Sequence, residues 1–270
     1  MKKINKLING IRALLKRPSL INLIIDSSEF HENKLKNKFR ETAKELPVIG
    51  FQNLCTEGKI QVSPFAFLEG GSLPTDLALL KILAQKNKDS VYFEIGTWRG
   101  ESVANVASVA KECYTLNLSS EEMQTLGLSK KYIDLHEHYS KKIKNVQHLK
   151  GHSFTFDFSP FKNKIDLVFV DGDHHYESVL KDTATAFSLL KNNQSIIVWH
   201  DYSAGPEMIR WEVFRGIYEA TPAEKRKHLY KVSNTQCAIY YPFDIENKYV
   251  EYPQTPELDF VVDIAFTKSL

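Results

Sequence analysis

The spacing of apolar residues changes along the chain and divides it into two parts. In the first 17 residues, apolar side chains recur every three or four positions, which predicts an amphipathic helix; these are Ile4, Leu7, Ile8, Ile11, Leu14 and Leu15. Pro18 then interrupts the pattern. Residues 27–46 predict a charged, exposed helix. Residues 47–72 are rich in Gly and Pro and predict a cap or lid of loops and short strands.

From residue 73 onward, short apolar runs alternate with helical patterns. The apolar runs predict strands over 91–95, 113–118, 146–149, 165–170, 195–199, 229–232 and 236–241. The helical patterns cover 75–85, 101–111, 121–144, 176–190 and 208–220. This alternation is typical of a doubly wound, mostly parallel α/β sheet with helices on both faces. We therefore predict a seven-stranded domain over residues 73–270 and an extension over residues 1–72.

Composition and charge narrow the class of protein. The net charge is +2 and no basic patch appears in the domain, so we expect no nucleic-acid partner. Cys55, Cys113 and Cys237 lack the spacing of a disulfide framework or a zinc site, which predicts a cytoplasmic location. No run approaches the roughly 18–20 apolar residues of a membrane span, and no signal peptide is expected.

The charge of the N-terminal helix leaves two interpretations open. The first 17 residues contain no acid and six basic residues, namely Lys2, Lys3, Lys6, Arg12, Lys16 and Arg17. In the first interpretation, the apolar face packs on the domain or on a second subunit of a homo-oligomer. In the second, residues 1–17 contact an anionic membrane peripherally, which would place the protein at its inner face.

A glycine turn follows the predicted strand 91–95, within the run YFEIGTWRGES at residues 92–102. Bare backbone at Gly96 and Gly100 allows a ligand to approach, and the N–H groups of the next helix point toward it. Glu94, at the end of the strand, can accept hydrogen bonds from an ammonium group. Trp98 stands where a dinucleotide motif has its second glycine. By itself, the turn fits either a ligand site or an ordinary strand-to-helix connection.

Polar side chains gather after two later apolar strands, 165–170 and 195–199. Asp171 ends one strand and is followed closely by Asp173, His174 and His175, and Asp201 follows the other strand. The carboxyl ends of parallel strands are where such sheets bind ligands. We therefore expect Asp171 and Asp201 at one rim, where their carboxylates suit Mg²⁺.

Together these motifs resemble class I S-adenosylmethionine-dependent methyltransferases. YFEIGTWRGES is similar to the first motif of that family, whereas VDGDHHYE (170–177) and IIVWHDY (196–202) resemble a subfamily of sugar and natural-product O-methyltransferases. CYTLNLSS (113–120) and LKGHSFTFDFSPF (149–161) resemble its second strand end and the loop beside the adenine. The resemblance covers about residues 73–242. It implies a Rossmann-like fold and S-adenosylmethionine as cofactor.

The resemblance also implies roles for individual residues. The implied cofactor-binding residues are Glu94, Gly96, Thr97, Trp98, Gly100, Asn117, Ser153, Phe154 and Asp171. His174 is the implied general base, Asp171 a second catalytic residue, and Asp171 with Asp201 the implied Mg²⁺ ligands. Three positions depart from the family pattern. Asn117 replaces an acid that binds the ribose, and His152 stands in the loop beside the adenine where an acid is common. His200 replaces an acid that often precedes the second aspartate.

The resemblance predicts O-methylation of a sugar, another hydroxylated small molecule or a glycan. One alternative is a metal-dependent hydroxylase on the same fold, with iron held by Asp171, His174 and either Asp201 or His200. Another is a non-catalytic, membrane-associated module, which the departure at Asn117 allows. Acceptor selectivity is expected in residues 47–72, in the loop 203–210 and after residue 241.

Overall fold

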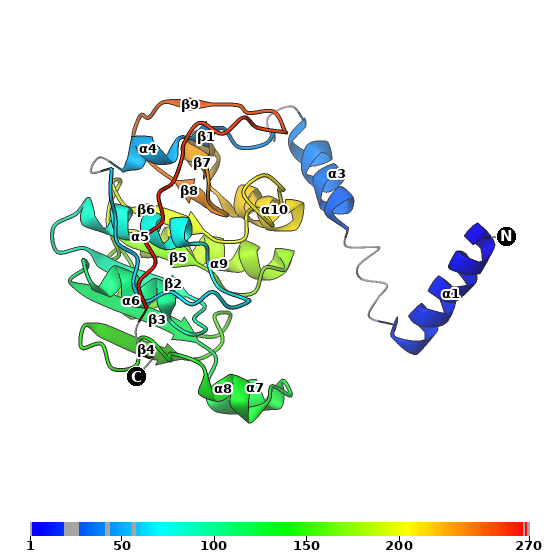
Figure 1. Cartoon of the computed structure of the whole chain (residues 1–270), viewed down its shortest axis with the longest axis horizontal. Helices are drawn as coiled ribbons and strands as arrows, with labels where there is room; N and C mark the ends of the chain where they lie inside the picture. The colour runs from blue at the N-terminus through cyan, green and yellow to red at the C-terminus, as the bar shows by residue number, and fades with distance from the viewer. Residues whose placement is uncertain (1, 19–26, 41–43, 56–57, 267, 269–270) are drawn as a thin grey trace.

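The computed structural model describes residues 2–18, 27–40, 44–55, 58–266 and 268. A large sheet lies between two layers of helices, and helix α1 stands apart from this body (Figure 1). The described strands form one nine-stranded sheet in the order β4-β3-β2-β5-β6-β8-β7-β1-β9. Their bounds are β1 (Val48–Ile49), β2 (Val91–Ile95), β3 (Glu112–Asn117), β4 (Val146–Lys150), β5 (Leu167–Val170), β6 (Ile196–Trp199), β7 (Leu229–Val232), β8 (Ala238–Tyr240) and β9 (Asn247–Lys248).

Helices of very different length connect these strands. The described α-helices are α1 (Lys2–Lys16), α3 (Ser28–Phe39), α4 (Phe51–Leu54), α5 (Pro74–Gln85), α6 (Glu101–Ala107), α7 (Ser120–Thr125), α8 (Lys130–Asp134), α9 (Tyr176–Leu189) and α10 (Trp211–Ala220). Two 3₁₀ helices, η3 (Ser159–Phe161) and η4 (Ala223–His228), complete the set. None of the helices that the structure describes has the length and apolar character needed to cross a membrane.

The mostly parallel sheet predicted from the sequence is confirmed. Strands β4, β3, β2, β5 and β6 run parallel to one another. Strand β8 runs antiparallel to β6, and β7 runs antiparallel to β8. The predicted helix over 121–144 is wrong, because α7 and α8 are two short helices. Gly127 separates them with a φ of 79°, and the Ser129 side chain then caps α8.

The N-terminal extension contributes to the sheet. Strand β1 pairs in parallel with β7, and β9 pairs antiparallel with β1, so the sheet has two strands more than predicted. The helix predicted as exposed over 27–46 is shorter than expected and buries His31 and Leu35, because α3 packs against α10. The domain boundary at residues 72/73 stays a prediction, although residues 48–49 lie within the main sheet.

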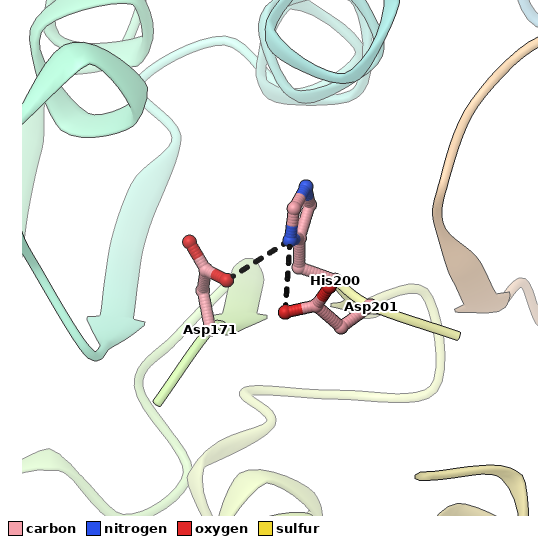
Figure 2. Close-up of side chains that lie close together, drawn as sticks. All are labelled: Asp171, His200 and Asp201. Carbon is pink, nitrogen blue, oxygen red and sulfur yellow. Dashed lines mark ion pairs between the residues drawn. The ribbon is translucent and has the colours of Figure 1, made fainter. Parts of the chain in front are cut away.

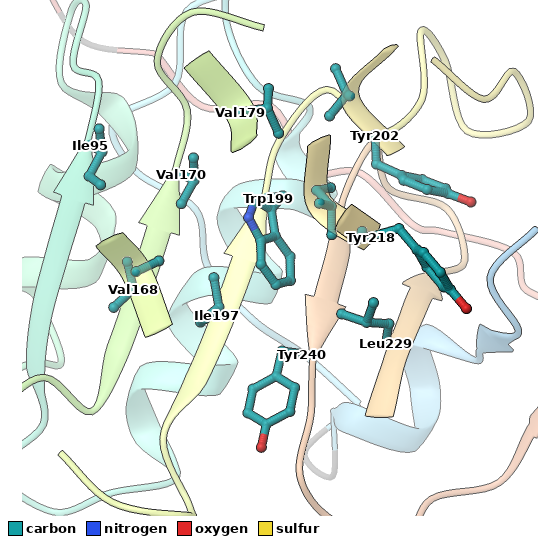
Figure 3. Close-up of a cluster of buried hydrophobic side chains, with 14 of the residues drawn as sticks. Ile95, Val168, Val170, Val179, Ile197, Trp199, Tyr202, Tyr218, Leu229 and Tyr240 are labelled. Atoms are coloured by element: carbon teal, nitrogen blue, oxygen red, sulfur yellow. The ribbon is translucent and has the colours of Figure 1, made fainter. Parts of the chain in front are cut away.

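Strands β5 and β6 are apolar throughout because helices cover both faces of the sheet. Successive side chains of a strand point to opposite faces. Val168, Val170, Ile197 and Trp199 face a core cluster that includes residues of α9 and α10 (Figure 3). On the other face, Tyr92, Leu167, Phe169, Ile196 and Val198 pack with residues of α5 and α6. This burial fixes the positions at which β2, β5 and β6 end.

Candidate active site

Three chain segments meet where β2, β5 and β6 end side by side. Each strand's pairing continues for one residue beyond the strand. The N–H of Gly96 donates to Leu116 O, that of Asp171 to Ile95 O, and that of His200 to Val170 O, at 2.9, 2.8 and 3.0 Å. The backbone therefore holds Gly96, Asp171 and His200 in register at one rim of the sheet.

His200 lies at the centre of the polar cluster at this rim. Its Nδ1 atom is 3.1 Å from Asp171 Oδ1 and 3.5 Å from Asp201 Oδ2 (Figure 2). Its Nε2 atom is 3.2 Å from Asp76 Oδ2. The His200 side chain is 8% exposed, whereas those of Asp171 and Asp201 are each 28% exposed. The ring is thus buried between three carboxylates, two of which reach the surface.

Opposite charges stabilise one another within this cluster. Burial opposes a charge on His200, but the neighbouring carboxylates, Asp171 foremost, outweigh burial and raise the pKa of the imidazole well above its ordinary value. Burial also favours the neutral form of Asp201. Contacts with His200 and with Arg210, whose Nη1 lies 2.7 Å from Asp201 Oδ1, instead lower the pKa of Asp201 to about 2. Asp201 is therefore ionised at neutral pH.

Asp76 is a member of the cluster that the sequence did not indicate. It is fully buried in the first turn of α5, where its Oδ2 accepts a hydrogen bond from the Leu73 N–H at 2.7 Å. Its Oδ1 accepts another from the Gln236 N–H at 2.8 Å. From the sequence alone, an acid in the first turn of a helix is interpreted as a capping residue. No spacing in the sequence links it to His200.

Only one of the three polar residues that follow Gly172 contacts the cluster. His174 is 46% exposed, and its Nδ1 lies 3.8 Å from Asp201 Oδ2. Asp173 instead binds the His175 ring and accepts a hydrogen bond from Ser178 Oγ at 2.8 Å, within the start of α9. His174 therefore joins Asp171 and Asp201 at the rim, whereas Asp173 and His175 organise the turn before α9.

The glycine turn needs glycine at both predicted positions. Gly96 has a φ of 97°, and a Cβ atom there would lie 2.1 Å from the backbone oxygen of Asp171. Gly100 has a φ of 81° and precedes α6, and a Cβ atom there would meet Ser140 Oγ at 2.3 Å. The turn after β2 therefore packs directly on the backbone after β5.

Contrary to the prediction from the sequence, Glu94 does not face the rim. Its side chain is fully buried and accepts hydrogen bonds from Tyr92 Oη at 2.6 Å and Thr97 Oγ1 at 3.0 Å. Thr97 is buried as well and also bonds Thr115. The half-buried Trp98 stacks on Tyr132 with ring centroids 5.3 Å apart. In the structure these side chains hold the turn in shape.

The burial of Glu94 predicts a pH dependence of stability. Burial raises the pKa of Glu94 to about 7, although the hydrogen bonds from Tyr92 and Ser102 oppose this. Since the folded pKa lies above the unfolded one, the fold loses stability as the pH rises through 7. Unfolding in urea at pH 5 and at pH 8 measures the free energy of unfolding. Between these pH values it is expected to fall by about 2 kcal/mol more in wild type than in the Glu94→Gln variant. Equal losses in the two proteins would contradict the assignment.

The residues expected at the ribose and adenine lie at the ends of β3 and β4. Asn117 is the last residue of β3, and its Nδ2 atom is buried without a hydrogen-bond partner in the described structure. Ser153 is half-buried and Phe154 is 44% exposed, both in the turn after β4. A buried amide without a partner is costly unless a ligand or water satisfies it. Asn117 thus suits a ligand oxygen.

Comparison with known proteins bears on this rim. Residues 93–202 match the family model described as a methyltransferase domain. The match begins within β2 and ends just after Asp201, so it contains the glycine turn and most of the polar cluster. It covers less than half of the chain.

Individual relatives match with low identity. An uncharacterized protein of Acanthamoeba polyphaga mimivirus is 28% identical over 164 residues, a match that spans 58% of this chain and 66% of that protein, just under two thirds. An O-methyltransferase from Bacillus cereus solved with SAH is 17% identical, with a TM-score of 0.44 over 64% of this chain and 84% of that one.

The O-methyltransferase TomG from Streptomyces achromogenes, solved with SAM, is 14% identical, with a TM-score of 0.41 over 63% of this chain and 80% of that one. The family model covers the strands that carry the rim, namely β2, β5 and β6. Residues 93–202 thus match a methyltransferase domain over the strands and turns that form the rim.

Proposed function

We propose that the protein methylates a hydroxyl oxygen of a sugar, another hydroxylated small molecule or a glycan. The observation that carries this proposal is the placement of His174 beside an ionised Asp201 at the open rim, next to the glycine turn. S-adenosylmethionine supplies an electrophilic methyl group. The residues of this chain then have two tasks, which are to align the acceptor oxygen and to remove its proton.

His174 is suited to the second task. It is the exposed histidine of the rim, and a ring nitrogen of a neutral imidazole can accept the proton of an acceptor hydroxyl. Asp201 lies 3.8 Å from its Nδ1 and is itself fixed by Arg210, so it orients the ring and stabilises the charge that forms. His200 is a poorer base because it is buried, and both of its ring nitrogens face carboxylates.

The rim also suits an acceptor with several hydroxyl groups. The carboxylates of Asp171 and Asp201 are partly exposed, and a carboxylate accepts hydrogen bonds from neighbouring hydroxyls. Arg210 adds donors beside Asp201, at the end of the 203–210 loop. This mixture of acceptors and donors favours a sugar-like molecule over an apolar one.

The cofactor fits the same rim from the side of β2 and β3. Gly96 and Gly100 let the turn after β2 pack directly on the Asp171 backbone and on Ser140, which holds the turn at this side of the rim. Asn117 Nδ2 has a free hydrogen for a ribose oxygen, which the acid usual at this position does not offer. The exposed Phe154 ring offers a face for the adenine.

The cluster fits a divalent metal ion, although not best Mg²⁺. Asp171, His200 and Asp201 each offer a ligand atom, and these atoms lie within 4.8 Å of one another. His200 Nδ1 is buried and makes no directed hydrogen bond, while Nε2 faces Asp76, an arrangement common for metal-binding histidines. An imidazole nitrogen suits manganese, iron or zinc better than Mg²⁺. Such an ion would lower the pKa of an acceptor hydroxyl.

Two measurements on the full chain test the proposed function. Calorimetric titration with S-adenosylhomocysteine is expected to show binding at one site. Mass spectrometry of reactions with hydroxylated sugars is expected to show products heavier by one methylene group. Parallel reactions with Mn²⁺, Mg²⁺ or EDTA are expected to be fastest with Mn²⁺.

The outcomes separate the alternatives. Failure to bind S-adenosylhomocysteine would overturn the cofactor site itself. Binding without turnover on any hydroxylated acceptor would instead favour a non-catalytic module. Turnover that is unchanged by EDTA would remove the metal ion and leave the proposed base in place.

A further inference from the structure

Helix α1 carries an apolar face that the described part of the chain leaves uncovered. Large apolar side chains are exposed along it, namely Ile4 at 62%, Leu7 at 65%, Ile8 at 42%, Ile11 at 50% and Leu15 at 78%. Within the described residues, no side-chain hydrogen bond, ion pair or ring contact joins α1 to another element, and Figure 1 shows it apart from the body. Exposed apolar surface of this extent is typical of an interaction site.

The apolar and basic residues of α1 occupy separate arcs. At about 100° per residue, Ile4, Leu7, Ile8, Ile11, Leu14 and Leu15 fall within an arc of about 120°. Lys3 and Arg12 stand at the two borders of this arc, and Lys6 and Lys16 lie on the opposite side. Long basic side chains at such borders can keep their charges in a polar layer while the apolar face is buried.

The length of α1 decides how it would meet a lipid bilayer. Its 15 residues extend about 22 Å, less than the roughly 30 Å of a hydrocarbon core. A helix of this length with a one-sided apolar face lies in the plane of the interface instead of crossing it.

Charge selects among the surfaces that could cover this face. Residues 1–25 contain no acid, and the first 17 contain six basic residues. A second copy of α1 packed against the first would bring these charges together with no acid to pair them. An anionic surface is complementary to them. We propose that α1 binds in the plane of an anionic lipid bilayer, with its apolar face among the acyl chains and Lys3 and Arg12 at the headgroups.

Co-sedimentation of the full chain with vesicles tests this proposal. Vesicles of phosphatidylcholine with about one third phosphatidylserine are expected to bind the protein, and pure phosphatidylcholine vesicles much less. The double variant Leu7→Ser/Ile11→Ser is expected to weaken binding roughly 100-fold, because two anchors no longer enter the acyl region. Lys6→Gln/Lys16→Gln is expected to weaken it roughly 10-fold, and added salt to weaken it further.

A matched control changes the polar face of the same helix. Asn5→Ser/Asn9→Ser introduces the same residue type at the same spacing and is expected to bind as wild type does. Melting temperatures of all variants are expected to agree, since α1 is exposed. Equal binding of the Leu7→Ser/Ile11→Ser variant and the control would overturn the proposal. So would a dimer in light scattering that this variant dissociates, because the face would then serve a second copy.

Discussion

Replacing His174 with Ala is expected to lower the rate of methyl transfer by about 10²–10⁴-fold, the usual contribution of a positioned general base. Asp201, fixed by Arg210, would remain in place but would have no ring to orient. Binding of S-adenosylhomocysteine is expected to stay within about twofold of wild type, because the proposed function assigns His174 to the acceptor and not to the cofactor. Steady-state rates, with calorimetry on the same samples, measure both quantities.

The neighbouring histidine provides a control for this variant. His175 is more exposed than His174, its ring stacks on that of His174, and it bonds Asp173 and not Asp201. His175→Ala therefore removes the same side chain one position away and is expected to change the rate less than about threefold. Similar losses in both variants would contradict the role of His174.

The Gly96→Ala variant is expected to destabilise the fold by about 2–4 kcal/mol and to abolish cofactor binding. A Cβ atom 2.1 Å from the Asp171 backbone oxygen forces β2 and β5 apart where they carry the rim. Overpacking of this kind costs about 1–3 kcal/mol, and an L-residue at a φ of 97° adds about 1 kcal/mol of backbone strain. Urea unfolding and S-adenosylhomocysteine titration measure the two effects.

The Gly127→Ala variant is a control that measures backbone strain without steric crowding. It has a φ of 79°, but a Cβ atom there would meet nothing within 4 Å. Gly127→Ala is therefore expected to cost only the backbone strain of about 1 kcal/mol and to leave cofactor binding unchanged. If Gly96→Ala and Gly127→Ala destabilise the protein equally, the close approach of Gly96 to Asp171 does not exist in solution.

The parts of the fold with strong local signals could be predicted from the sequence. Strands β5 and β6 are buried on both faces, so their apolar runs are unbroken and easily recognised, and β2 is interrupted only by Glu94. Because parallel strands end at one rim, the order of the strands was enough to bring Asp171 and Asp201 together. The backbone register places ligand atoms of these two residues within 4.8 Å of each other at the rim.

The features that could not be predicted from the sequence depend on contacts between distant segments. Strands β1 and β9 have two residues each, which is too short for any periodicity. Asp76 and His200 are 124 positions apart, and each has an ordinary local interpretation. Glu94 was expected to face a ligand because strand ends usually do. The alternation of the strand instead turned it inward, where Tyr92 and Thr97 satisfy it.

The position of His200 has a consequence for turnover. Its ring is held by Asp76 on one side and by Asp171 and Asp201 on the other, and it has little access to water. Reorienting the ring would break contacts with carboxylates on both sides, so its orientation is set when the domain folds and persists from one catalytic cycle to the next. Exposed side chains such as His174 and Phe154 can instead change rotamer during each reaction. The rim thus combines a buried histidine of fixed orientation with exposed side chains that can reorient.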